Sequence, residues 1–176
     1  HINKGMAMLQ EHINNPHCLT SKKQQISQRL EGMERLVPGA LAPDFVIRDN
    51  QGNNFQFHKW KAKAQYKLLL FWTTTCGDCL KLVDELRQWH NQPVNKKKLD
   101  IVAVNLDEAE DGKWETAILT LSGWKHLHAK EGVNSPVARD YAILSTPVMF
   151  LIGSENNIIV SVPDSFEQLL EKLQEK

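Results

Sequence analysis

The stretch FWTTTCGDC, residues 71–79, places two cysteines, Cys76 and Cys79, three positions apart directly after a run of apolar residues. Residues 66–73 (YKLLLFWT) have the length and composition of a buried strand. An amphipathic pattern begins at the cysteines, so we expect both to lie on the first turn of a helix. There the unpaired backbone N–H groups and the helix dipole favour a thiolate. The spacing therefore predicts redox chemistry, with Cys76 as the nucleophile that attacks a disulfide and Cys79 as the cysteine that resolves the mixed disulfide.

The motif alone also fits half of a structural zinc site, which needs four ligands. The remaining ligands would have to be found among Cys18, His90, His126 and His128. No second pair stands at zinc-ligand spacing in the sequence, and three cysteines are too few for a disulfide framework. A close pair with one outlier favours the redox interpretation. Two unrelated core cysteines remain an alternative, and Cys18 is either an incidental or a third redox thiol.

A second apolar run, residues 99–106 (LDIVAVNL), is rich in β-branched residues and predicts another buried strand. Between the two strands, residues 82–89 carry apolar side chains at helical spacing. The order strand, helix, strand predicts a right-handed βαβ unit with parallel strands. Such a unit directs the carboxyl end of its first strand at Cys76.

Further elements are expected on both sides of this unit. They are a β-hairpin of residues 45–47 and 55–57, a helix through Trp114, Ile118 and Leu121 that ends at Gly123, a short strand at 126–129, a helix capped by Ser135, a hairpin of 148–152 and 158–160, and a final helix after Ser165 with a capping box completed by Gln168. We place the main domain at residues 38–176. Residues 1–37 show apolar residues at spacings of three and four, which predicts a helical N-terminal extension or the remnant of a larger N-terminal region.

The composition limits the classes of protein to which the chain belongs. Of 176 residues, 41% are hydrophobic and 24% are charged, with 21 basic and 21 acidic residues. This composition is typical of a globular protein, and the balanced charge does not indicate nucleic acid or an anionic membrane as a partner. The longest apolar run, residues 68–72, is far shorter than the ~18 residues that indicate a membrane span. Because the chain begins at His1 within a polar stretch, we expect a processed or truncated chain that lacks any signal peptide or anchor upstream.

Several segments together resemble the thioredoxin-like family, and within it the periplasmic TlpA/ResA type, which is related to the peroxiredoxins. They are Phe71-Trp72 before the first cysteine, Ala42-Pro43-Asp44-Phe45, Ala138-Arg139-Asp140-Tyr141, and residues 146–152 (TPVMFLI). The resemblance extends from residue 38 to the C-terminus. It implies an α/β thioredoxin-like fold, in which helices flank a central mixed β-sheet, with the N-terminal helical extension and a βα insertion within residues 107–141.

The resemblance also implies an activity, partners and site residues. The chain resembles thiol–disulfide oxidoreductases in which the Cys76–Cys79 disulfide itself is the redox carrier, so no other cofactor and no metal is expected. The implied partners are client proteins with disulfides and an upstream thiol reductant, and the implied location is periplasmic or otherwise extracytoplasmic. Thr146, the cis-proline Pro147 and Trp72 are the implied substrate-binding residues. Without the resemblance, Pro147 is equally a proline that opens a strand.

Three positions depart from the pattern of the family. Thr75 precedes the first cysteine, where a large residue is common, so part of the usual apolar surface is absent. Leu70 and Leu82 stand where relatives carry an acidic proton acceptor. Neither usual acceptor is therefore present.

The candidates for a substitute acceptor are Asp78, Asp84 and Glu85. Asp78, which lies between the cysteines, is expected with Gly77 to tune the redox potential. Its negative charge disfavours the Cys76 thiolate. Because a stabilised thiolate makes such a pair oxidising, we expect this pair to be a reductant. Asp84 and Glu85, farther along the helix, are expected to belong to a solvated face.

Other functions remain open at this point. A peroxiredoxin has threonine three and proline seven residues before its cysteine; Thr73 fits and Leu69 does not, and no arginine is placed by a motif. A non-enzymatic binding module would use the helical extension for docking. His126 and His128 alternate on a short strand and so share one face, as metal ligands can, but the sequence identifies no third ligand.

Overall fold

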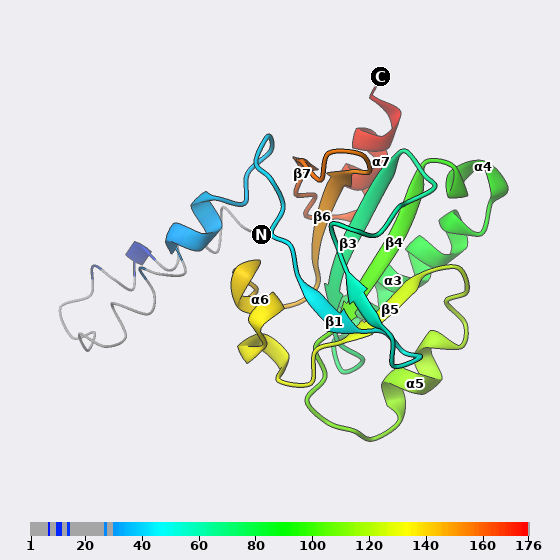
Figure 1. Cartoon of the computed structure of the whole chain (residues 1–176), viewed down its shortest axis with the longest axis horizontal. Coiled ribbons are helices and arrows are strands. Elements are labelled where there is room, and N and C mark those ends of the chain that lie inside the picture. The colour runs from blue at the N-terminus through cyan, green and yellow to red at the C-terminus, as the bar shows by residue number, and fades with distance from the viewer. Residues whose placement is uncertain (1–6, 8–9, 12–13, 15–26, 28–29, 176) are drawn as a thin grey trace.

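The computed structural model describes residues 7, 10–11, 14, 27 and 30–175. A five-stranded mixed sheet with the order β5-β4-β3-β6-β7 forms the centre of the molecule (Figure 1). The elements are β1 (Val46–Arg48), β2 (Asn54–Gln56), β3 (Tyr66–Trp72), α3 (Gly77–His90), α4 (Pro93–Lys96), β4 (Leu99–Asn105), α5 (Lys113–Ile118), β5 (Lys125–His128), a 3-10 turn (Gly132–Asn134), α6 (Pro136–Asp140), β6 (Val148–Gly153), β7 (Ile159–Ser161) and α7 (Phe166–Gln174).

The central strand, β3, pairs in parallel with β4 and antiparallel with β6. Six of its seven residues are buried, because helices and the β1–β2 hairpin cover both faces of the sheet, which explains its unbroken apolar run. The chain passes from β3 through α3 to β4, so the predicted βαβ order and parallel pairing are confirmed. The predicted α/β fold, with helices flanking a mixed sheet, is confirmed as well.

The hydrophobic core is divided by the sheet into two clusters, because alternate residues of each strand point to opposite faces. The aromatic cluster lies between the sheet and the segments 30–57 and α6, and its large members include Phe45, Phe57, Phe71, Tyr141 and Phe150. The thiol cluster lies between the sheet and α3, α5 and α7, and its members include Trp72, Cys79, Leu82, Trp114, Trp124 and Met149. The buried cysteine, Cys79, therefore belongs to one face of the sheet.

The predicted N-terminal extension lies largely outside the described residues. Of the part that is described, residues 30–34 are helical (Figure 1). Met33 and Leu36 are 4% and 2% exposed and join the aromatic cluster. This end of the extension therefore packs on the sheet-containing body, while the boundary near residue 38 stays a prediction.

α5 ends earlier than the sequence predicts. The spacing of Trp114, Ile118 and Leu121 predicts a helix as far as Gly123, but the helix ends at Ile118. In residues 119–121, each N–H donates to the carbonyl three residues before it, so the chain tightens into turns. Leu121 is nevertheless buried, so the pattern indicated burial correctly and the end of the helix wrongly.

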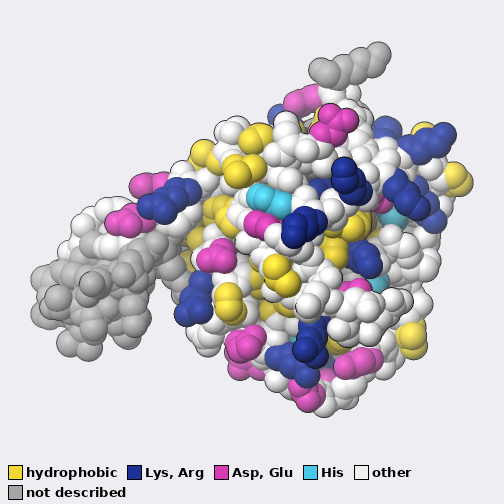
Figure 2. Space-filling model, viewed as in Figure 1, with side chains coloured by type: hydrophobic (Ala, Val, Ile, Leu, Met, Phe, Trp, Pro, Cys, Tyr) yellow, Lys and Arg dark blue, Asp and Glu magenta, His cyan; other side chains and the backbone are white. Residues whose placement is uncertain are grey.

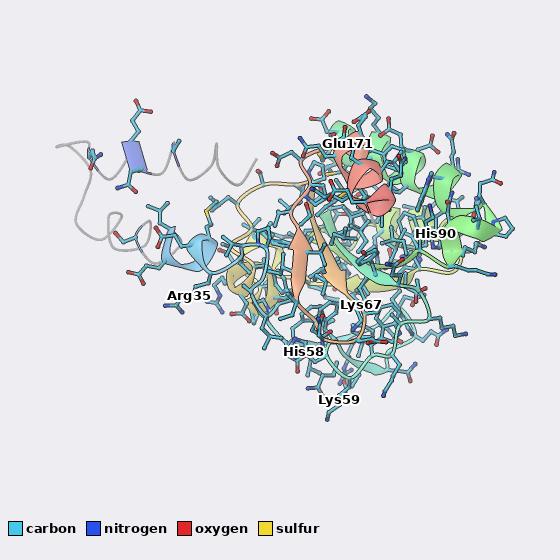
Figure 3. All side chains as sticks on the ribbon, turned by 90° about the horizontal axis from the view of Figure 1, so that it is seen from above. Arg35, His58, Lys59, Lys67, His90 and Glu171 are labelled. Carbon is cyan, nitrogen blue, oxygen red and sulfur yellow. The ribbon has the colours of Figure 1, made fainter. Side chains whose placement is uncertain are left out.

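Two further features are the mixed charge of the surface and a buried lysine at the amino end of β3. Acidic and basic side chains are interspersed on the face seen in Figure 2, in keeping with the zero formal charge. Lys67 lies buried at the amino end of β3 (Figure 3), where its ammonium donates to Asn157 Oδ1 at 2.8 Å and lies 5.1 Å from the Phe57 ring centroid. Burial lowers the pKa of Lys67. None of the described helices has the length and apolar content to cross a bilayer.

Candidate active site

Cys76 caps the N-terminus of α3. Its Sγ accepts a hydrogen bond from the Cys79 N–H at 3.2 Å, which uses one of the N–H groups that a helix start leaves unpaired. Its thiol donates toward the carbonyl of Thr146 at 3.6 Å, and the side chain is half-buried. The sulfur is thus accessible, in contact with a helix N-terminus and fixed in direction, as an attacking thiol has to be.

Cys79, one turn further along α3, is fully buried in the thiol cluster. Burial raises the pKa of the Cys79 thiol to about 11; the hydrogen bond with Cys76 acts in the same direction, and hydrogen bonds from Thr146 and Thr73 oppose it. Both thiols are free in this structure. Cys76 is therefore accessible to a partner, whereas Cys79 is buried and its thiol stays protonated.

The Thr146–Pro147 loop lies against this turn. The peptide bond between the two residues is cis. Thr146 contributes its carbonyl to Cys76, and its hydroxyl lies 3.3 Å from that of Thr73. The structure thus brings Thr146 to the cysteines from a position seventy residues along the chain.

Two grooves flank this loop. The first, of about 310 Å³, is lined by the threonines of the active-site loop and by Asp107, Glu108 and Asp111. The second, of about 350 Å³, runs between α3 and α7 and is lined by Asp78, Lys81, Leu82, Glu85, Pro147, Phe166 and Glu167, among others. Among the charged side chains that line the two grooves, carboxylates outnumber basic groups in both.

The remaining predicted site residues occupy different environments. Gly77 and Asp78 are exposed on the first turn of α3, and nothing lies within 4 Å of the position of a Cβ at Gly77. Trp72 is 0% exposed and belongs to the thiol cluster. The sequence analysis assigns Trp72 to substrate binding, but a fully buried side chain supports the site from beneath and does not touch a client.

The structure also shows where the acidic side chains of α3 lie, and what surrounds the two positions at which relatives carry an acidic proton acceptor. Leu70 and Leu82 are buried, so the two positions where relatives carry an acid are apolar here. Asp84 is exposed and bonds to Arg87 and Gln88 on its own helix, as expected for a solvated face. Glu85 lines the groove between α3 and α7.

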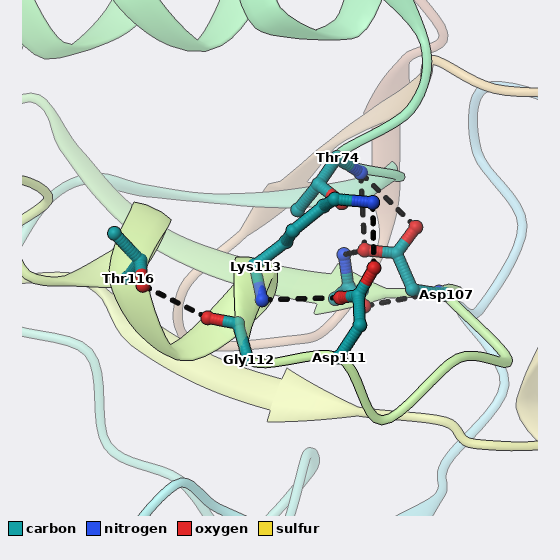
Figure 4. A network of polar contacts seen from close by, with 7 residues as sticks. Thr74, Asp107, Asp111, Gly112, Lys113 and Thr116 are labelled. Atoms are coloured by element: carbon teal, nitrogen blue, oxygen red, sulfur yellow. Dashed lines mark hydrogen bonds and ion pairs between the residues drawn. The ribbon is translucent and has the colours of Figure 1, made fainter.

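Asp107 is a site residue that the sequence analysis missed. Both of its carboxylate oxygens accept the Thr74 N–H, each at 3.1 Å, so it holds the loop that precedes Cys76 (Figure 4). A signal was present, because Asp107 follows a buried parallel strand and the carboxyl ends of such strands meet at one edge of a sheet. The apolar pattern of the strand ends at Leu106, so Asp107 falls at the start of the expected insertion.

The two candidate metal ligands on β5, His126 and His128, have other contacts in the structure. His126 and His128 lie at ring-centroid distances of 6.3 Å from Trp124 and 4.7 Å from Trp114, and each has Nε2 within hydrogen-bond distance of a backbone carbonyl. Within the described part of the chain, no three His, Cys, Asp or Glu side chains are grouped to hold a metal ion. Cys18 lies outside the described residues.

Comparisons with known proteins agree with this geometry. The model of a family described as thioredoxin-like matches residues 64–158. The chain is 26% identical to the thiol-disulfide oxidoreductase ResA of Bacillus thuringiensis subsp. konkukian over 146 residues, 81% of this chain and 78% of that protein. For ResA of Bacillus subtilis the identity is 27% over 140 residues, 73% of this chain and 68% of that protein. The thioredoxin domain of a thiol-disulfide oxidoreductase from Bacteroides vulgatus has a TM-score of 0.65 and 28% identity, covering 79% of this chain and 96% of that one.

Proposed function

Because the chain belongs to the thioredoxin-like family, with relatives of the TlpA/ResA type, we propose that it reduces disulfides of extracytoplasmic client proteins through Cys76 and Cys79. In reaction class it is a thiol–disulfide oxidoreductase. The observation that carries the proposal is the asymmetry of the pair. Cys76 is half-buried at a helix N-terminus, whereas Cys79 is fully buried and its thiol has a raised pKa.

The exchange takes place in two steps. The Cys76 thiolate attacks one sulfur of the client disulfide, and the other client sulfur leaves as a thiolate that takes up a proton. Cys79 then gives up its proton and attacks Cys76 Sγ, which releases the second client thiolate. The client gains two electrons and two protons, and Cys76 and Cys79 become a disulfide. An upstream thiol reductant restores the dithiol, so the proposed pair needs no other cofactor.

The division of labour follows from where the two sulfurs lie. A client has access to Cys76; Thr146 beside it lines both grooves, and Pro147 lines the second. Cys79 stays protonated while a client binds, because burial disfavours its thiolate. It becomes the attacking group only when Cys76 is already in a mixed disulfide one helical turn away.

The direction of the reaction is proposed to depend on Asp78. Its side chain is exposed between the cysteines, where a negative charge disfavours the Cys76 thiolate and so favours the disulfide form. The pair is then a reductant. A location outside the cytoplasm and clients with exposed disulfides follow from the resemblance to the TlpA/ResA type.

A redox titration against glutathione tests the direction. A potential near that of thioredoxin, about −270 mV, supports a reductant, and a potential near about −120 mV contradicts it. Asp78→Asn should make the pair more oxidising by roughly 10–30 mV, which corresponds to at most about tenfold in the equilibrium constant. Asp84→Asn, on the same helix but bonded to Arg87, is the control and should leave the potential unchanged. Equal potentials for the wild type and Asp78→Asn would contradict the proposal that Asp78 influences the redox potential of the pair.

A further inference from the structure

We propose that Asp107 is a positioning residue for the disulfide exchange, because it fixes the loop that sets Cys76 at the N-terminus of α3. The loop consists of residues 73–75, between the end of β3 and Cys76. This inference rests on the proposed function of the cysteine pair. It assigns a role in that reaction to a residue of β4's carboxyl end, outside the motif.

The side chain of Asp107 is buried, and both of its carboxylate oxygens accept hydrogen bonds. Asp107 is 9% exposed. Its two carboxylate oxygens each lie 3.1 Å from the Thr74 nitrogen, and Oδ2 also accepts from Asn105 Nδ2 at 3.0 Å. The Asp107 N–H donates in return to Asn105 Oδ1 at 3.0 Å. A buried carboxylate with three such contacts is held in one orientation, because it is costly to bury unless its oxygens are bonded.

The backbone places Asp107 where it can reach the loop. Trp72, the last residue of β3, pairs with Asn105, the last residue of β4, and the Leu106 N–H donates to the Trp72 carbonyl at 2.9 Å. The two strands thus end side by side, so the residues that follow β3 lie next to the residues that follow β4. The carbonyl of Asp107 also lies 2.7 Å from His128 Nε2, which ties the same residue to β5.

The loop is held from two sides. On one side, Asp107 accepts a hydrogen bond from the Thr74 N–H. On the other side, the hydroxyls of Thr73 and Thr146 lie 3.3 Å apart. Cys76 Sγ in turn lies 3.6 Å from the Thr146 carbonyl. If the Asp107 contact is lost, the loop keeps its contacts with Thr146 and Cys79 but loses its bond at Thr74, and Cys76 gains freedom relative to the helix N-terminus. Misplacement of a reacting group by about 1 Å can cost about 100-fold in rate.

The network differs from the other acidic contact in Figure 4. Asp111 pairs with Lys113 at 2.6 Å and also accepts the Lys113 N–H, so its contacts stay within its own segment. Asp107 instead joins two segments that are 33 residues apart in the sequence. Of these two carboxylates, only Asp107 acts on the loop before Cys76.

The test compares Asp107→Ala, Asp107→Asn and Asn105→Ala in the full chain with Cys18 replaced by serine. Three readouts are measured on folded protein: kcat and KM for insulin disulfide reduction, the alkylation rate of Cys76 by iodoacetamide, and the redox potential. For Asp107→Ala we expect about a tenfold fall in kcat with KM nearly unchanged, and an altered Cys76 alkylation rate. Asp107→Asn retains an oxygen for the Thr74 N–H and should lose about threefold, as should Asn105→Ala.

Glu110→Ala is the matched control, because Glu110 is exposed, is paired with Lys130 and belongs to the same segment. It should match the wild type in all three readouts. Wild-type kinetics, alkylation and potential in Asp107→Ala would overturn the proposal and leave Asp107 a purely structural residue. If that variant does not fold, wild-type values in both Asp107→Asn and Asn105→Ala overturn it. If the wild type reduces insulin no better than Cys76→Ser, the proposed function fails instead, and Cys76 alkylation still tests the positioning role.

Discussion

The two faces of the central sheet are equally well packed but differ in chemistry. In the aromatic cluster the buried hydroxyl of Tyr141 donates to the Pro43 carbonyl at 2.7 Å. The thiol cluster contains Cys79, and the indole N–H groups of Trp72 and Trp114 there are buried without a hydrogen-bond partner. The described members of the aromatic cluster include no cysteine, while Cys79 is buried in the thiol cluster and Cys76 packs against it. A change on the aromatic face should therefore cost stability without altering the thiols.

The largest effect is expected from two neighbouring residues of β6 that point to opposite faces. Phe150 packs edge-on against Tyr141 and Phe71 in the aromatic cluster, and Met149 lies in the thiol cluster. Replacing either by alanine should reduce the free energy of unfolding, by about 3–5 kcal/mol for Phe150 and about 2–5 kcal/mol for Met149. Only Met149→Ala should also speed the alkylation of Cys79. Urea denaturation and alkylation kinetics measure the two effects, and faster Cys79 alkylation in Phe150→Ala would break the distinction between the faces.

The next effect concerns the two cysteines themselves. Because the pKa of Cys79 is raised from 9.0 to about 11, its thiolate fraction at pH 7.5 falls about 100-fold. In a Cys18→Ser, Cys76→Ser variant, which keeps the burial of Cys79 but lacks the contributions of Cys76, iodoacetamide should modify Cys79 about 10- to 100-fold more slowly than it modifies free glutathione. The matched variant, Cys18→Ser with Cys79→Ser, leaves Cys76 as the reporter and should react much faster. Equal rates for the two cysteines would contradict the asymmetry of the pair.

The smallest effect is expected from pH and again concerns the thiol face. Burial lowers the pKa of His90 (Figure 3) and of His126. The unfolded chain then binds more protons than the folded one below about pH 6.5, so stability is complete above that pH and is lost as the pH falls through the folded pKa values. The loss should be modest, because the bonds of the two rings to the carbonyls of Leu99 and Leu121 survive protonation, while the bond that Trp124 Nε1–H donates to His90 Nδ1 is lost.

Denaturation between pH 7.5 and 5.0 measures this effect, and His90→Gln should flatten the dependence. The interval avoids the hydrogen-bonded carboxylates such as Asp44 and Asp49, whose pKa values are lowered and which titrate in stronger acid. A protein that becomes more stable on acidification in this range would contradict the argument.

Local pattern predicted most of the secondary structure. The apolar runs gave β3 and β4, and Ser135 followed by Pro136 marked the start of α6, where Ser135 Oγ accepts the Ala138 N–H at 3.3 Å. At α7, Ser165 accepts the Gln168 N–H as predicted, but the Gln168 side chain bonds to the N–H of Asp164 and not to that of Ser165. The residue types at a helix start predict that a capping interaction exists more reliably than they predict which atoms form it.

The parts that were missed depend on contacts between distant segments. Asp107 and Thr74 meet because of the register between β3 and β4, which the βαβ prediction implied but did not specify. Trp72 stands four residues before Cys76, yet it is the last residue of a strand that is buried on both faces, so its side chain lies in the core. Predicting such sites requires the strand register as well as the identity of the strands.

The most direct test of the central claim is to trap the mixed disulfide. Cys79→Ser and Cys76→Ser variants, both in a Cys18→Ser background, are incubated with a disulfide-bonded client such as insulin, and the adducts are mapped by mass spectrometry. The account predicts that Cys79→Ser accumulates an adduct joined through Cys76, and that Cys76→Ser accumulates none. An adduct through Cys79 in the Cys76→Ser variant, formed as fast as the other, would contradict the assignment of nucleophile and resolving cysteine.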